Sequence, residues 1–223
     1  MCGRFTLSQS DQSIADVFQL SEIPPVKPRY NISPTQAVPV VFQTTNSPAR
    51  KFTYMHWGLI PSWADDPKIG ARMINARAET VTEKPSFRTA FKRRRCLVVA
   101  DGFYEWKKTD EGKQPFYIQL DHHQPFGFAG LWEHWQHADG SEIESCTIVT
   151  TEPNELLRPI HNRMPVILNP DDYDRWLNPE VQDAKSLQPL LRPYDAQQMI
   201  HYPVSMVVNN PQNDSPECIR AIA

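Results

Sequence analysis

The fold of this chain is decided by residues 96–107, CLVVADGFYEWK. Cys96–Ala100 is a short apolar run of the kind that forms a fully buried strand. The turn signal Asp101-Gly102 follows it, and alternation of apolar and polar residues then predicts a second strand over Phe103–Lys107. Two consecutive strands joined by a tight turn favour an antiparallel sheet.

The rest of the chain extends this β-rich pattern outward. The turn signals Glu111-Gly112 and Asp139-Gly140 separate further apolar or aromatic runs. Strands are expected over residues 38–42, 53–57, 116–120, 126–132, 146–151 and 200–208. Short helices are expected after the N-cap Ser10, from Pro85 to about Arg93, and over residues 171–177 and 183–191, with a loop at 61–72.

Composition favours one compact domain. The 223 residues are enough for one substantial core, and 21 prolines against 8 glycines argue against a helical bundle. We therefore expect a single α+β domain over residues 1–223, with an antiparallel sheet or barrel-like core and short flanking helices.

Charge, cysteine spacing and hydropathy restrict the function. A net charge of −3 gives no global attraction to nucleic acid, so any DNA-binding surface has to be local. The four cysteines show no CxxC spacing, and we expect no metal and no cofactor. The N-terminus has no apolar signal core, and no run approaches the ~20 residues that span a bilayer. We expect a cytoplasmic protein with reduced thiols and no membrane partner.

Cys2 acquires two nucleophiles if Met1 is removed, which is common when the second residue is small. The free α-amine and the thiol, with ordinary pKa values of about 8 and about 8.5, are both partly available near neutrality. Such a 1,2-aminothiol condenses with an aldehyde to an iminium ion, which the thiol closes to a five-membered thiazolidine ring. A cysteine at position 2 is usually incidental, so this hypothesis needs support from other residues.

Two polar segments suit a sugar–phosphate substrate. On an extended backbone Asn75 and Arg77 point the same way, the amide towards a sugar and the guanidinium towards a phosphate. A capped helix start with a surface arginine is the alternative. Further along, His161 is suited to proton transfer near pH 7 and Arg163 to a second phosphate, although a lone histidine is more often structural.

Glu105 is expected on the same strand face as Phe103. Partial desolvation there raises the pKa of a carboxyl group towards values useful in acid–base catalysis. The alternative is an exposed carboxylate paired with Lys107 or Lys108.

Two further features fit either DNA binding or ordinary structure. The dense basic run Lys92–Arg95 suits a DNA groove or a solvated helix end. Trp57, Pro61 and Trp63 suit stacking against bases or wedging between them, or packing in the core.

Taken together and in this order, the segments resemble the SRAP family of abasic-site processing proteins. The matching motifs are MCGRF at 1–5, RYNISP at 29–34, WGLIP at 57–61, INARAET at 74–80, RCLVVADGFYEW at 95–106, HNRMP at 161–165 and YPVS at 202–205. Val99 stands where family members often have proline, and Asn162 where aspartate is common. Neither departure touches the candidate reacting groups.

The resemblance implies a role for each candidate residue. Cys2 would form a reversible thiazolidine cross-link with the ring-opened sugar of an abasic site in single-stranded DNA, which shields the lesion. Asn75 would orient the amine and the sugar, and Glu105 would move protons. His161 would assist sugar opening and reversal of the link. The expected DNA contacts are Arg4, Arg77, Arg163, Trp63 and Pro61, in a monomer that is nucleoid-associated if bacterial.

Two other functions remain open. A cysteine peptidase would use Cys2, His161 and Asn75, and autoproteolytic removal of Met1 is one form of it. A non-covalent reader of single-stranded or modified DNA would make Cys2 incidental and would bind intact and abasic strands equally.

Overall fold

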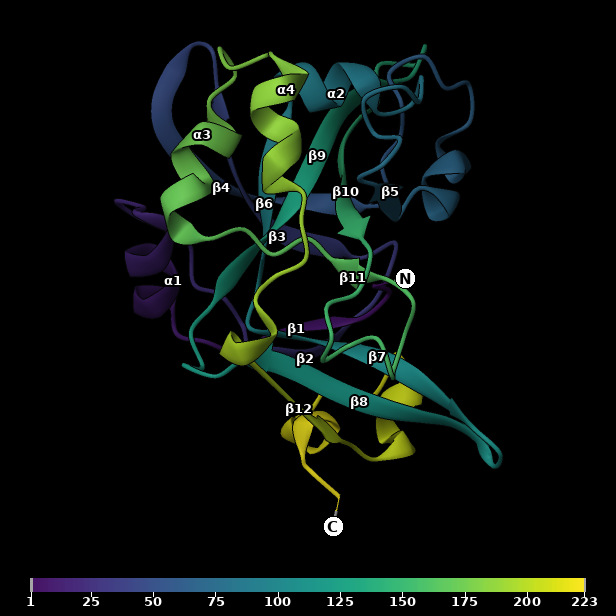
Figure 1. Ribbon diagram of the computed structural model, residues 1–223. Coiled ribbons are helices and arrows are strands. Elements are labelled where there is room, and N and C mark those ends of the chain that lie inside the picture. The colour runs from purple at the N-terminus through teal and green to yellow at the C-terminus, as the bar shows by residue number, and fades with distance from the viewer. Residues whose placement is uncertain (1, 223) are drawn as a thin grey trace.

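The computed structural model describes residues 2–222 and contains two β-sheets with short helices around them (Figure 1). The first sheet is antiparallel and has the order β12 (Met199–Pro203), β8 (Gly112–Leu120), β7 (Gly102–Thr109), β1 (Phe5–Leu7) and β2 (Arg29–Ile32). β7 and β8 form the long hairpin at the lower right of Figure 1. Gly112 begins β8 with a φ of 133°, a conformation that favours glycine.

The second sheet closes into a barrel. Its path is β10 (Glu142–Thr151), β4 (Ser47–Trp57), β3 (Ala37–Thr44), β6 (Arg95–Ala100) and β9 (Phe126–Gln136), and β9 pairs again with β10. At the end of β10, β5 (Asn75–Arg77) pairs with it in parallel and β11 (Met164–Pro165) antiparallel. The β4–β10 pairing is also parallel, and the other pairings along the path are antiparallel. The predicted α+β fold with a barrel-like core is confirmed.

The main core joins the first sheet to the barrel. The ring of Phe5 in β1 meets Trp57 of β4 edge-on at 5.1 Å between centroids, and Phe128 of β9 at 5.9 Å. Phe103 of β7 also lies 5.9 Å from Phe128. All four side chains are fully buried, and burial of each such ring contributes about 1.5–3 kcal/mol or more. This packing fixes β1, and the chain just before it, against the barrel.

Short helices surround the barrel. α1 (Asp11–Phe18) begins after Ser10 as predicted, because the Ser10 hydroxyl accepts a hydrogen bond from the Ser13 N–H at 3.2 Å. α2 (Arg88–Arg93), α3 (Tyr173–Leu177) and α4 (Ala184–Leu187) lie on the side of the barrel away from the first sheet (Figure 1). The 3₁₀ turns are Pro67–Arg72, Pro170–Asp172, Gln188–Leu190, Ala196–Gln198, Met206–Asn209 and Pro216–Ile219.

Several predicted segments are wrong in their bounds. β4, β8 and β10 begin before the predicted strands, β9 ends after its predicted strand, and the predicted loop at 61–72 contains the 3₁₀ turn Pro67–Arg72. α2 begins at Arg88 rather than at Pro85, because the chain first makes a turn in which the Lys84 carbonyl accepts from two following N–H groups. The strand predicted over 200–208 ends at Pro203, and the Val204 N–H makes one further hydrogen bond to the Pro115 carbonyl at 3.0 Å. The hydroxyl of Ser205 then caps the 3₁₀ turn that follows.

The basic run Lys92–Arg95 is not a continuous DNA-facing surface. Arg95 is 2% exposed. Its guanidinium donates to the backbone carbonyls of Phe91, Lys92, Trp176, Asn178 and Val181. Arg94 forms an ion pair with Glu133 at 2.7 Å. Arg95 therefore connects α2 to the end of α3 and to the segment that follows it.

Three general features bear on function. Within residues 2–222 all four cysteines are buried and free. The same residues contain no group of three or more side chains placed to hold a metal ion. No helix among them is long and apolar enough to cross a membrane.

Candidate active site

Cys2 lies in the core directly before β1, with an exposed fraction of 0%. Burial, and after it the charge of Glu105, raises the pKa of the Cys2 thiol well above its usual range. The thiol is therefore protonated at neutral pH and needs a base before it can attack an electrophile. Met1 lies outside the described residues, so its removal stays a prediction.

Asn75 holds the backbone of Cys2. It begins β5, opposite Ile148 of β10, and its Nδ2 donates to the Cys2 carbonyl oxygen at 2.9 Å. Its Oδ1 is buried and accepts no hydrogen bond from the described residues. An amide acceptor beside the Cys2 backbone is thus available to an amine or a hydroxyl group. The strand interpretation of this segment is confirmed, and the capped helix start is wrong.

Glu105 lies on the buried face of β7. Its exposed fraction is 2%, and burial raises the pKa of its carboxyl group to about 7. Phe103 shares this face, as predicted, whereas Tyr104 packs in a separate cluster on the other side. The alternative of an exposed carboxylate is wrong. A carboxyl group with a pKa near 7 is suited both to accept and to donate a proton.

His161 lies beside Glu105, and its ring is oriented by the backbone of Arg163. His161 Nε2 is 3.9 Å from Glu105 Oε2. His161 Nδ1 accepts from the Arg163 N–H at 3.0 Å and lies 3.1 Å from the Arg163 carbonyl oxygen. Burial lowers the pKa of His161, which favours the neutral ring. A neutral ring whose Nδ1 accepts from the Arg163 N–H carries its proton on Nε2, the atom that faces Glu105.

Two of the arginines predicted to bind phosphate contact protein groups in this structure. Arg163 donates to both carboxylate oxygens of Glu79, at 2.6 and 2.9 Å, and to the Thr150 carbonyl at 2.6 Å. Arg4 donates to Asn31 Oδ1 at 2.7 Å and to the Val208 carbonyl at 2.8 Å. Each guanidinium therefore joins segments that lie far apart in the sequence.

The other predicted DNA contacts differ in exposure. Arg77 is exposed on β5, near Asn75. Trp63 is 59% exposed and borders a hollow of about 540 Å³, whose charged lining residues are Asp65, Asp66, Lys68 and Arg72. Pro61 is buried. A large exposed indole suits base stacking, whereas the buried Pro61 needs a local movement to reach a base.

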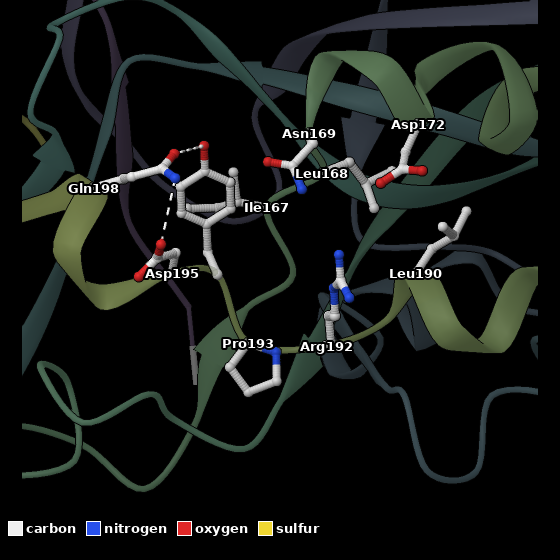
Figure 2. Close-up of a pocket in the computed structure, with 10 residues that line it drawn as sticks. Ile167, Leu168, Asn169, Asp172, Leu190, Arg192, Pro193, Asp195 and Gln198 are labelled. Atoms are coloured by element: carbon white, nitrogen blue, oxygen red, sulfur yellow. Dashed lines mark hydrogen bonds between the residues drawn. The ribbon is translucent and has the colours of Figure 1, made fainter.

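The polar pocket in Figure 2 lies elsewhere in the molecule. It has a volume of about 410 Å³ and is walled by residues 167–172 and 190–198. Arg192 projects into it towards Asn169 (Figure 2). On its other wall, Gln198 accepts a hydrogen bond from the Tyr194 hydroxyl and donates one to Asp195. No residue of the candidate active site lines this pocket.

Sequence reasoning missed the residues that hold the site together. Glu79 and the Thr150 carbonyl both accept hydrogen bonds from the Arg163 guanidinium, and Asn31 accepts one from Arg4. Glu79 lies in the same short segment as Asn75, and a carboxylate there was a signal for an arginine partner. The partner itself could not be identified without the fold.

Comparison with known proteins places the chain in a family. Residues 1–211 match the model of the family described as SOS response associated peptidase (SRAP). The chain is 46% identical to the abasic site processing protein YoqW of Bacillus subtilis, over 99% of this chain and 100% of that protein. It is 35% identical to the abasic site processing protein HMCES of Xenopus tropicalis, over 88% of this chain and 67% of that protein. The chain therefore belongs to the SRAP family.

A solved structure shares the whole fold. The crystal structure of a protein from Bacteroides thetaiotaomicron superposes with a TM-score of 0.88 at 26% identity, and 100% of each chain is covered. The arrangement of the two sheets is therefore also found in a crystal structure of another protein.

Proposed function

We propose that this protein processes abasic sites by capturing them covalently in single-stranded DNA through Cys2. The observation that carries the proposal is the grouping of Asn75, Glu105 and His161 around the second residue of the chain. Asn75 donates to the Cys2 carbonyl, Glu105 lies close enough for its charge to raise the pKa of the Cys2 thiol, and His161 Nε2 lies 3.9 Å from Glu105. The names of the relatives YoqW and HMCES, both abasic site processing proteins, supply the substrate.

The proposed reaction begins with the sugar. In its ring-closed form the abasic deoxyribose is a hemiacetal, and opening moves the proton of the C1′ hydroxyl to the ring oxygen. The Glu105 carboxylate accepts the hydroxyl proton and returns it to the ring oxygen, and a neutral His161 with its proton on Nε2 is suited to donate a hydrogen bond to that oxygen without losing the proton. Opening leaves a C1′ aldehyde beside Cys2.

Capture then forms two bonds and releases one water. After removal of Met1, the Cys2 α-amine adds to the aldehyde, and loss of water gives an iminium ion. The Cys2 sulfur adds to the same carbon as the thiol gives up its proton, and the ring nitrogen ends as a neutral amine. Glu105 takes and returns the protons, because its pKa of about 7 lets it hold either state near neutrality. Asn75 orients the amine through Oδ1, which accepts no hydrogen bond from residues 2–222.

We propose that Arg77 and Trp63 contact the strand. Arg77 is exposed two residues from Asn75, where a phosphate next to the lesion would pass, and the exposed Trp63 offers a face for a base. Neither reads a base edge, so we expect little sequence preference. The reacting groups all come from one chain, so a monomer suffices.

Intact mass spectrometry tests the proposal directly. Protein lacking Met1 is mixed with a single-stranded oligonucleotide that carries one abasic site. We expect a gain equal to the oligonucleotide mass minus one water, and no gain with an intact oligonucleotide or with Cys2→Ala. Absence of an adduct from protein that lacks Met1 would overturn the proposal. Equal non-covalent binding to intact and abasic strands would then favour a non-covalent DNA reader. Peptide cleavage that survives acetylation of the α-amine would favour a cysteine peptidase.

A further inference from the structure

Glu79 and Arg163 form a bidentate ion pair at the edge of the candidate active site. The Arg163 side chain is 17% exposed and the Glu79 side chain 49%. The hydrogen bond from Arg163 lowers the pKa of Glu79, so the carboxylate is ionised at neutral pH. Bidentate pairing fixes the orientation of a guanidinium as well as its position.

Arg163 connects this ion pair to the reacting groups. Its side chain also donates to the Thr150 carbonyl of β10 at 2.6 Å. Its backbone N–H, at 3.0 Å from His161 Nδ1, sets which way the imidazole faces. The ring orientation of His161 therefore depends on a residue whose own position is fixed by Glu79 and Thr150.

We propose that Glu79 is a positioning residue, which acts through Arg163 to hold His161 Nε2 towards Glu105. This inference rests on the proposed function and assigns a role to a residue that touches neither the sugar nor Cys2. The segment that carries Asn75 and Arg77 thus also controls the histidine contributed by the distant His161–Arg163 turn.

The geometry predicts an unusual combination of effects on removal of the Glu79 charge. A strand phosphate and the Glu79 carboxylate compete for the same face of the Arg163 guanidinium. Loss of the carboxylate frees that face and removes a negative charge, so DNA affinity stays the same or rises. The imidazole loses its support, and a misplacement of about 1 Å slows chemistry by up to about a hundredfold.

The test compares Glu79→Gln, Glu79→Asp and Glu83→Gln in protein lacking Met1. Glu79→Gln keeps the shape but places an amide NH₂ against a guanidinium N–H. Glu79→Asp keeps the charge. Glu83→Gln is the matched control, because Glu83 is exposed in the same loop and forms no ion pair among the described residues. The single-turnover rate of adduct formation is measured at saturating abasic oligonucleotide, and affinity is measured with a strand carrying a reduced abasic site, which has no aldehyde.

We expect Glu79→Gln to lower the rate of adduct formation at saturating oligonucleotide about tenfold or more without weakening DNA binding. Glu79→Asp should have a rate between those of Glu79→Gln and the parent, and Glu83→Gln should match the parent. A parental rate in Glu79→Gln, or the same loss in Glu83→Gln, would overturn the inference. ¹⁵N NMR of the His161 ring provides an independent measurement if the parent forms no adduct and the proposed function itself fails. The parent ring should be the Nε2–H tautomer, and a Glu79→Gln ring with identical shifts would contradict a positioning role.

Discussion

Replacement of Glu105 by glutamine should stabilise the protein at alkaline pH. The carboxyl group is 2% exposed, and burial raises its pKa from the usual 4.5 to about 7. Since a difference of one pKa unit is worth about 1.4 kcal/mol, the fold disfavours the ionised carboxylate by about 3 kcal/mol. Glutamine keeps the shape of the side chain and never ionises.

The sign of the pH dependence follows from the raised pKa. Between about pH 4.5 and pH 7 the folded protein binds the Glu105 proton more tightly than the unfolded chain does. Wild-type stability therefore falls as the pH rises through this window, and the Glu105→Gln protein escapes that loss. Relative to wild type, the variant should gain up to about 3 kcal/mol in unfolding free energy between pH 4 and pH 8.

Urea unfolding of the two proteins at intervals from pH 4 to pH 8 measures this gain. Glu111→Gln, at an exposed glutamate in the β7–β8 turn, is the control and should follow wild type. A stability difference between Glu105→Gln and wild type that stays constant with pH would refute the raised pKa. The same variant should form the proposed adduct about a hundredfold more slowly or worse, because it cannot transfer a proton.

Three further predictions concern other residues. Arg77→Ala should weaken binding to intact single strands and reduce the steepness of the plot of log affinity against log salt by about 0.7, as measured by fluorescence anisotropy. An unchanged slope would exclude a phosphate contact. Asn75→Ala should slow adduct formation about tenfold or more at unchanged DNA affinity in single-turnover gels, and an equal loss of affinity would make Asn75 a DNA ligand instead. Arg95→Ala should lower the unfolding free energy, measured in urea, by about 3–5 kcal/mol, because it leaves buried carbonyl groups without their hydrogen-bond donor. A loss below about 1 kcal/mol would contradict the structural role.

The sequence predicts the longer strands well and the shortest ones poorly. β6, β7, β8, β9 and β10 each carry enough alternating or apolar residues to be recognised from their own pattern. β1, β2, β5 and β11 have between two and four residues, and partners elsewhere in the chain define them. A three-residue strand such as β5 has too little local sequence to distinguish it from a loop, so only the β10 ladder shows that Asn75 and Arg77 lie on one edge.

The same limit applies to the site. The residue types at Glu105 and His161 indicated acid–base chemistry, and Asn75 indicated a hydrogen bond to a sugar. The structure brings all three to the region of Cys2. Sequence alone could not show how the charges are paired. Arg163 was expected to face a phosphate, yet its guanidinium lies on a carboxylate that no local pattern connects with it. Charge pairing across the fold depends on distances that the chain order does not contain.

Burial also determines the order of the proposed steps. Burial raises the pKa of Glu105 to about 7, and it also raises the pKa of the Cys2 thiol, which then lies well above neutral pH. Little of the thiol is therefore ionised to thiolate at pH 7. An α-amine has an ordinary pKa of about 8 and supplies a useful neutral fraction at pH 7. The amine should therefore attack first, and the thiol should close the ring only as Glu105 removes its proton. Under the proposed function, a cysteine without that amine would lack the group that attacks first, so the proposal requires the reacting residue to stand second in the chain.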